Sequence, residues 1–186
     1  MPAIRSKSIV ALSKPAETTT KRNLTLKVRA SGGGEVVYPV AEAREDCSKC
    51  DIFYPTDEAS RKAFLTTKGK KVTPHQWAVY DFTRTIPCGR ITTYKDLCDA
   101  LGQGSPRSVG SALRNNPFAP YVPCHRIIAS NLYIGGFFGE WGTGKDEKLR
   151  KGNGVQCHKK MEMLAKEGIA FSREGYLVDK GLVWRG

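Results

Sequence analysis

The sequence predicts an α/β (α+β) protein in which a mainly helical domain over residues 72–186 contains a helix-turn-helix. Two observations predict this class. After residue 72, helix-capping residues precede apolar positions at helical spacing, and short β-branched stretches lie between these segments. Residues 1–71 carry weaker signals, and we expect them to form a partly flexible region or a small β subdomain.

Composition excludes several classes of protein. The chain has 186 residues, of which 40% are hydrophobic and 26% charged, as is ordinary for a globular protein. No stretch approaches the roughly 18 consecutive apolar residues of a membrane span, and the first residues lack the apolar core of a secretory signal. Lys and Arg outnumber Asp and Glu by 30 to 18, and the net charge of +12 indicates a polyanionic partner or an anionic membrane surface.

The six cysteines are too sparse for a disulfide framework in a chain of this length, so we expect thiols in a reducing compartment. Cys47 and Cys50 have the spacing of half a zinc site, but a second pair at compatible spacing is not evident. A structural zinc ion and a pair of surface thiols are the two interpretations.

Strand signals in the first part of the chain are confined to two stretches. Residues 24–29 alternate apolar and polar positions, and residues 36–40 could pair with them across the glycines at 32–34. Residues 56–71 are charged, and we expect a linker or a frayed helix there.

The first clear helix begins at Pro74. Thr73 and Gln76 predict a capping box at its start, and proline is favoured at the first helical position. We expect this helix to end before Pro87, which cannot continue it.

Two further helices follow at short distance. One begins at Tyr94 after the N-cap Thr93 and ends at Gly102, a residue suited to a helix C-terminus. The other begins after Ser105 and ends near Asn115. Two helices joined by so short a glycine-containing turn predict a helix-turn-helix.

The second of these two helices has unlike faces. One face is apolar, whereas the other has an arginine at each end and almost no side chain between them. Glycine inside a helix costs about 1 kcal/mol relative to alanine, which suggests that a second surface approaches closely. That surface is either a shallow nucleic-acid groove or another helix of the same protein. The apolar face comprises Val109, Ala112 and Leu113, and the smooth face comprises Arg107, Gly110, Ser111 and Arg114.

Residues 121–126 contain a candidate nucleophile. Pro123 fixes the chain before Cys124, and His125 and Arg126 follow. An imidazole and a cation near a thiol favour the thiolate, which is the nucleophilic form. Cysteine is also a common small core residue, so a structural role for Cys124 stays open at this point.

The remaining segments carry weaker signals. The glycine pair 135–136 would let a ligand or backbone approach closely, or would form a plain turn. A Gly- and Lys-rich loop covers 142–154, and we expect a last helix with Asn153 as its N-cap. Residues 169–186 are expected to form a short hairpin or tail around 179–181.

In their order and spacing, these motifs resemble the C-terminal domain of the O6-alkylguanine-DNA alkyltransferases, also called methylated-DNA–protein-cysteine methyltransferases. The resemblance covers roughly residues 72–168. It is carried by the Thr-Pro-x-Gln helix start, the segments Gly89–Tyr94, Arg107–Pro117 and Val122–Ile128, the pair Gly135–Gly136, and the helix end Leu164–Gly168.

The resemblance implies catalytic roles for five residues. Cys124 would accept the alkyl group irreversibly, His125 would act as a base through a water molecule, and Glu167 would orient His125. Tyr94 would rotate the phosphate and hydrogen-bond the alkylguanine ring, and Asn116 would brace the turn before the active-site segment.

The resemblance also implies two sets of binding residues. DNA would be bound through its minor groove, with Arg107 inserted where the flipped nucleotide leaves the stack. The DNA-binding residues would be Arg107, Gly110, Ser111, Arg114, Tyr94 and Thr93. The substrate pocket would be lined by Tyr94, Cys124, Ile127, Tyr133 and Ile134.

The implied function is DNA repair by a suicide enzyme that flips O6-alkylguanine out of double-stranded DNA and alkylates itself in a single turnover. No metal or organic cofactor, no membrane contact, a monomeric state and a nuclear location are expected. One alternative is a lesion sensor that flips the base without chemistry, although such relatives typically lack the acceptor cysteine. The other is an unrelated cysteine hydrolase, which would leave the smooth, doubly basic helix face unexplained.

Overall fold

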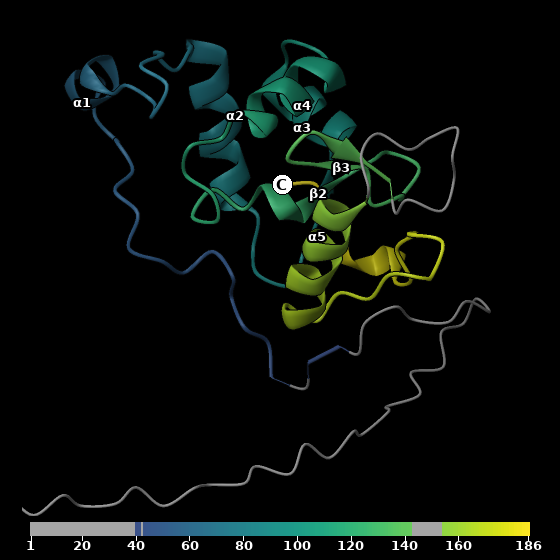
Figure 1. Cartoon of the computed structure of the whole chain (residues 1–186). Helices are drawn as coiled ribbons and strands as arrows, with labels where there is room; N and C mark the ends of the chain where they lie inside the picture. The colour runs from purple at the N-terminus through teal and green to yellow at the C-terminus, as the bar shows by residue number, and fades with distance from the viewer. Residues whose placement is uncertain (1–39, 42, 143–153) are drawn as a thin grey trace, which may run out of the picture.

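The computed structural model describes residues 40–41, 43–142 and 154–186. In these ranges, helices pack around very short strands, in agreement with the predicted fold class (Figure 1). None of the described helices is long and apolar enough to cross a membrane. The helices are α1 (Glu58–Ala63), α2 (Pro74–Thr85), α3 (Tyr94–Leu101), α4 (Pro106–Arg114) and α5 (Val155–Lys166). The short elements are β1 (Thr92–Thr93), β2 (Ile127–Ile128), β3 (Gly136–Phe137), β4 (Glu140–Trp141) and the 3₁₀ turns η1 (Cys124–Arg126) and η2 (Lys180–Leu182).

The predicted starts of α2, α3 and α4 are confirmed. In α2 the Gln76 backbone N–H donates to the Thr73 hydroxyl at 3.2 Å, and the Gln76 side chain accepts from the Thr73 N–H at 2.9 Å. Ser105 closes a similar box at the start of α4. Gly102 ends α3 in the left-handed conformation at φ +62°, where a side chain would be strained.

The main core lies between α2, α3 and α4 and includes residues from the first part of the chain. The rings of Tyr54 and Phe64 each lie 4.9 Å from the ring of Phe118, which is 1% exposed. Residues 40–71 are therefore not wholly separate from the helical domain, and the boundary expected at residue 72 crosses one core. Residues 56–71, expected to be a linker or a frayed helix, contain the short helix α1.

Two strand pairs fix the connections around the helices. The parallel pair β1–β2 sets Thr92 beside Ile127, so the start of α3 lies next to the segment after η1. The antiparallel pair β3–β4 sets Phe137 opposite Glu140 and forms a tight hairpin. A second core cluster, which includes Ile91, Ile128 and Leu164, packs between β2 and α5.

Several expectations for the ends of the chain need correction or lie outside the described residues. The N-cap of α5 is Gly154 rather than Asn153, because Gly154 adopts φ +81° immediately before the first helical residue. Residues 179–181 enter the 3₁₀ turn η2, and the hairpin lies earlier, where Phe171 pairs with Leu177. The strand expected at 24–29 lies outside the described residues, as do the strand expected at 36–40 except for its last residue and the loop expected at 142–154 except for its two end residues.

Candidate active site

The turn η1 directs three successive side chains to different surroundings. Pro123 precedes it, and the Arg126 N–H donates to the Pro123 carbonyl at 2.9 Å. A 3₁₀ turn has three residues per turn, so consecutive side chains point about 120° apart. Cys124 lines a cavity, whereas His125 and Arg126 enter a buried polar network, with exposures of 1% and 2%.

The cavity beside Cys124 has a volume of about 750 Å³. The smooth face of α4 forms one of its walls, whereas Val109 and Ala112, on the opposite face, are buried against the core. The two faces expected from the sequence are confirmed for these residues, whereas Leu113, expected on the apolar face, also lines the cavity. The predicted site residues on the cavity wall are Tyr94, Arg107, Gly110, Ser111, Arg114 and Cys124.

Asn116, which lies outside the cavity lining, and Tyr94, which is part of it, both hydrogen-bond backbone groups near the site. The Asn116 side chain donates to the Val122 carbonyl at 3.0 Å and accepts from the Phe118 N–H at 2.9 Å, so it closes the turn between α4 and η1. The Tyr94 hydroxyl donates to the Gly136 carbonyl at 3.2 Å, which ties α3 to the β3–β4 hairpin. Hydrogen bonds to backbone groups therefore fix the positions of both side chains.

Four predicted binding residues are not on the cavity wall. Ile127 and Ile134 are fully buried, and Tyr133 packs against Tyr176 with ring centres 5.2 Å apart, because this stretch of chain lies inside the core. Thr93 is 4% exposed, and its hydroxyl is occupied in capping α3. The interpretation of the three apolar residues as pocket lining is wrong.

The hairpin β3–β4 supplies the cavity wall that the sequence reasoning missed. Phe137, Phe138 and Trp141 line the cavity, and Phe138 and Trp141 are 47% and 37% exposed. Phe138 has φ +45°, an unusual conformation for a residue other than glycine. Three aromatic residues around Gly139, within the five residues 137–141, were the available sequence signal.

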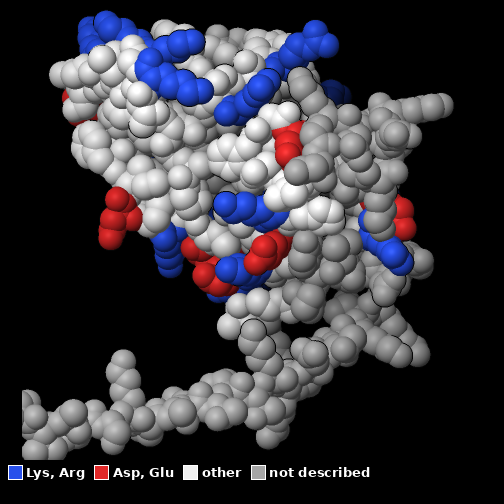
Figure 2. Space-filling model, in the orientation of Figure 1, with Lys and Arg blue, Asp and Glu red and all other residues white. Residues whose placement is uncertain are grey.

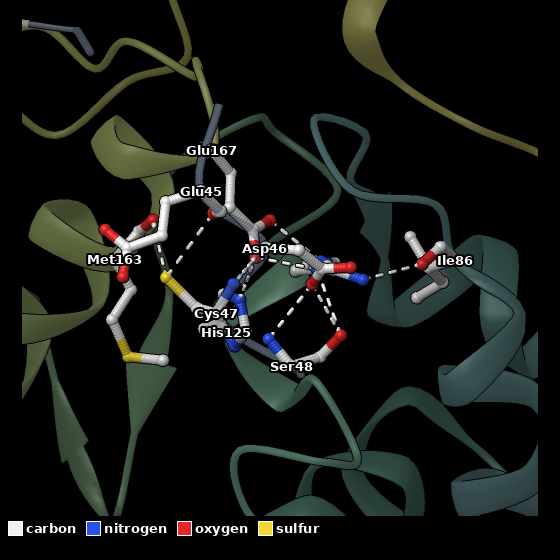
Figure 3. A network of polar contacts seen from close by, with 9 residues as sticks. Glu45, Asp46, Cys47, Ser48, Ile86, His125, Met163 and Glu167 are labelled. Carbon is white, nitrogen blue, oxygen red and sulfur yellow. Dashed lines mark hydrogen bonds and ion pairs between the residues drawn. The ribbon is translucent and has the colours of Figure 1, made fainter. Parts of the chain in front are cut away.

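The buried side of η1 is a network centred on Glu167 (Figure 3). Glu167, at the end of α5, is fully buried, and its Oε1 lies 2.9 Å from His125 Nε2. The Arg126 guanidinium donates to both carboxylate oxygens, at 2.8 and 2.7 Å, and also to the Ile86 carbonyl. The structure therefore brings together His125 and Glu167, as expected from the sequence.

The segment 44–48 closes this network from the outside. Asp46 accepts a hydrogen bond from the Arg126 guanidinium and another from the Ser48 hydroxyl, and the Cys47 N–H donates to Glu167 Oε1 at 3.2 Å (Figure 3). The sequence indicated nothing of this contact, because it joins residues about 80 to 120 positions apart.

The network fixes the charge of its members. Burial raises the pKa of Glu167, but the hydrogen bonds from His125 and Arg126 outweigh burial and leave that pKa below its ordinary value. Burial lowers the pKa of His125, so its imidazole is neutral at pH 7 and can accept a proton. Burial raises the pKa of the Cys124 thiol, and a hydrogen bond with Asn116 and the charge of Lys160 offset this only in part.

Comparison with known families decides the classification. The family model described as "6-O-methylguanine DNA methyltransferase, DNA binding domain" matches residues 74–169. The chain belongs to this family. The match includes α2 to α5, the cavity and Glu167.

Curated relatives of the alkyltransferase family are similar over the same region. A methylated-DNA–protein-cysteine methyltransferase of Saccharolobus solfataricus is 38% identical over 98 residues, which cover 51% of this chain and 64% of the relative. A Shigella flexneri protein of the same name is 41% identical over 83 residues, which cover 44% of this chain and 47% of that protein. The chain thus spans about half to two thirds of the length of these relatives.

Solved structures of alkyltransferases and related proteins are also similar. The O6-methylguanine-DNA methyltransferase of Pyrococcus kodakaraensis is 33% identical, with a TM-score of 0.41, over 61% of this chain and 56% of that one. S. pombe Atl1, solved with damaged DNA containing O6-carboxymethylguanine, is 23% identical, with a TM-score of 0.47, over 63% of this chain and 100% of that one.

Lys160 is a buried cation of this alkyltransferase-family chain that sequence reasoning missed. It is fully buried on α5, and its ammonium donates to the carbonyls of Ile127 and Ile134 at 2.6 and 2.7 Å, and to that of Gly136 at 3.2 Å. Burial lowers the pKa of Lys160 to about 8, so it still carries its charge at pH 7. It joins β2 to β3 beneath the cavity and lies close enough to Cys124 to favour the thiolate.

The zinc alternative for Cys47 and Cys50 is not supported by their surroundings. Among the described residues, the group with metal-ligand spacing is Asp46, Cys88 and Glu167, which includes neither Cys47 nor Cys50. Its two carboxylates already bind Arg126. Burial raises the pKa of Cys47 to about 11, which disfavours the thiolate that zinc requires.

Proposed function

We propose that this protein repairs DNA by moving an alkyl group from O6 of guanine to the sulfur of Cys124, once per molecule. The observation that carries this proposal is the position of the Cys124 thiol in a cavity walled by the smooth, doubly basic face of α4. Membership of the family supports it. A cysteine hydrolase would have no use for that face.

The target base has to leave the double helix to reach the thiol. The alkyl carbon on O6 is stacked inside the duplex, and extrusion costs a few kcal/mol, less for a poorly paired, damaged base. Gly110 and Ser111 allow α4 to approach a minor groove closely, and Arg107, exposed at the start of α4, fills the place of the extruded nucleotide. Figure 2 shows Lys and Arg side chains along the upper edge of the face in view, where Figure 1 places α1, α2 and α4, and such cations favour binding of backbone phosphates.

The transfer is a displacement at carbon. The Cys124 thiol gives its proton through a water molecule to the neutral His125, and the resulting imidazolium is stabilised by Glu167 at 2.9 Å. The thiolate forms the carbon–sulfur bond as the carbon–O6 bond breaks, and the electron pair of that bond remains with guanine.

Guanine then needs a proton. The His125 imidazolium returns the proton it took from the thiol, through water, while the Tyr94 hydroxyl turns from the Gly136 carbonyl and donates a hydrogen bond to O6 or N3. Burial raises the pKa of Tyr94, so the hydroxyl keeps its proton in this role. Sulfur and carbon make a stable thioether, so the protein is not regenerated. The transfer uses no metal or organic cofactor, because the protein itself supplies the nucleophile and the acids and bases.

Intact-mass spectrometry after incubation with a duplex that contains O6-methylguanine tests the proposal. Covalent transfer adds one methyl group, about 14 Da, in a 1:1 ratio and then stops. A protein that binds the damaged duplex without any change in mass would be a lesion sensor. A protein that neither binds nor gains mass would contradict the proposal outright.

A further inference from the structure

A second hollow adjoins the cavity and is lined by basic side chains from separate parts of the chain. Its volume is about 440 Å³, and its wall includes Lys95 of α3, Lys180 of η2 and Arg185 near the C-terminus. Lys95 and Ser130 line both the hollow and the cavity, so the two lie side by side. The family match ends at residue 169 and does not include Lys180 or Arg185.

Backbone contacts hold the C-terminal segment against the start of α3. The Ile91 N–H donates to the Leu182 carbonyl at 3.1 Å, and the Trp184 N–H donates to the Ile91 carbonyl at 2.6 Å. The Arg90 guanidinium donates to the Gly181 carbonyl at 2.7 Å. Ile91 directly precedes β1, so these bonds hold the C-terminal segment beside α3.

The hollow favours an anion. Lys95, Lys180 and Arg185 are all exposed, and the lining includes one carboxylate, that of Asp96. Asp96 is already engaged, because its Oδ2 accepts from the Thr93 hydroxyl at 2.7 Å. The hollow also lies at the N-terminus of the eight-residue helix α3, where the helix dipole adds positive potential.

We propose that this hollow binds backbone phosphates of duplex DNA beside the extruded nucleotide, and that Lys180 and Arg185 extend the DNA contact beyond the helix-turn-helix. The inference rests on the proposed function, because it takes the cavity as the place of the base. A nucleotide entering the cavity carries its own strand across the shared wall at Lys95 and Ser130. The next phosphates of that strand then face the three cations and the Ser130 hydroxyl.

Salt dependence of DNA binding tests this contact. Binding of unmodified duplex is titrated from 50 to 200 mM salt for the wild type and for the double variant Lys180→Gln/Arg185→Gln. Each lost phosphate contact lowers the slope of log K against log salt by about 1, so we expect the slope to fall by about 2. Affinity at 0.1 M salt should fall by about tenfold or more.

The variant Lys49→Gln/Lys159→Gln is the matched control. It also removes two exposed positive charges, but neither lysine lines the hollow or the cavity. Urea unfolding of both variants checks that the fold is kept. An equal change of slope in the two double variants would overturn the inference. The binding titration uses unmodified DNA and does not depend on alkyl transfer. A wild type that binds this DNA but gains no methyl group in the mass experiment would therefore contradict the proposed function and leave the phosphate contact standing.

Discussion

The two sides of η1 differ in burial and in polar contacts. On one side Cys124 meets an open cavity whose helical wall has small side chains and exposed arginines. On the other side His125 and Arg126 are buried, and Glu167 satisfies both of them. Three consecutive residues therefore separate a surface left open for a partner from an ionic network closed within the protein.

The difference shows where stability and function lie in this chain. A buried carboxylate is tolerated only with complete partners, and Glu167 receives hydrogen bonds from Arg126 and the Cys47 N–H and lies against His125. The cavity wall keeps Gly110 inside a helix, where alanine would be more stable. Changes on the buried side should therefore reduce stability, whereas changes on the open side should reduce DNA repair.

Glu167→Ala is expected to have the largest effect. It leaves a buried guanidinium and imidazole without their shared carboxylate, which costs about 3–5 kcal/mol in the free energy of unfolding. Urea denaturation measures the loss. Glu58→Ala, which removes an exposed carboxylate paired with Lys62, should change stability little. A loss below about 1 kcal/mol for Glu167→Ala would refute the structural importance of the network.

Arg107→Ala should slow repair of duplex DNA by about tenfold or more, because each 1.4 kcal/mol of lost stabilisation of the extruded state is a factor of ten. Reaction with the free alkylguanine base, which needs no extrusion, should be slowed much less. Single-turnover rates on the two substrates give the comparison. Equal slowing on both would remove Arg107 from the extrusion step.

Lowering the pH should reduce the free energy of unfolding in two stages, because two groups of the buried network titrate. The pKa of His125 is lowered below 6.5 in the folded protein, so below pH 6.5 the unfolded chain binds a proton that the folded one does not. Glu167 adds a second loss below pH 4.5, for the same reason. The free energy of unfolding should thus be nearly level around pH 7, below the range in which Lys160 loses its proton, and should fall below pH 6.5. A tenfold difference in proton affinity between the folded and unfolded chains corresponds to about 1.4 kcal/mol of that fall.

Urea titrations between pH 7.5 and pH 4 measure this profile. The variant His125→Gln should lose the decline between pH 6.5 and 4.5 and keep the decline below it. A wild type whose stability rises as the pH falls from 6.5 to 5 would contradict the direction in which folding moves the pKa of His125.

The helical wall of the open side could be predicted from local sequence, whereas the closed side could not. Helix caps and the spacing of apolar positions in α4 depend on neighbours within one or two turns, so they could be predicted from the sequence. The caps are Thr73, Thr93 and Ser105. The bonds of Arg126 to Asp46 and Glu167 span 80 and 41 positions. Only the pairing of His125 with Glu167 was expected, and it came from the family resemblance.

The prediction of the pocket lining was also wrong for a physical reason. Ile127 and Ile134 follow the nucleophile closely in sequence, but strand pairing turns them into the core. The β3–β4 hairpin brings Phe137 and Phe138 to the cavity instead, through a residue with positive φ that no periodicity indicates.

Gly110→Ala should have the smallest effect on stability, but it separates stability from DNA binding because the two should change in opposite directions. A Cβ at this position would meet only Tyr94 Cε1, at an ordinary 3.9 Å, so stability should rise by about 0.5–1 kcal/mol. Duplex binding should weaken at the same time, because the added methyl group holds the groove away. Gly102→Ala is the control: its φ of +62° strains alanine, and stability should fall. Unchanged DNA affinity in Gly110→Ala would contradict close approach at this face.

The acceptor atom is tested most directly by peptide mapping after reaction with an O6-methylguanine duplex. Trypsin releases residues 115–126, in which Cys124 is the one cysteine. We expect a mass gain of about 14 Da on this peptide of the wild type. The variant Cys124→Ser should still bind the duplex but gain no mass. The variant Cys157→Ser should be fully methylated, because the buried Cys157 thiol points to a backbone carbonyl and not into the cavity. Methyl transfer to Cys124→Ser, or to any other peptide of the wild type, would contradict the assignment of Cys124 as the acceptor.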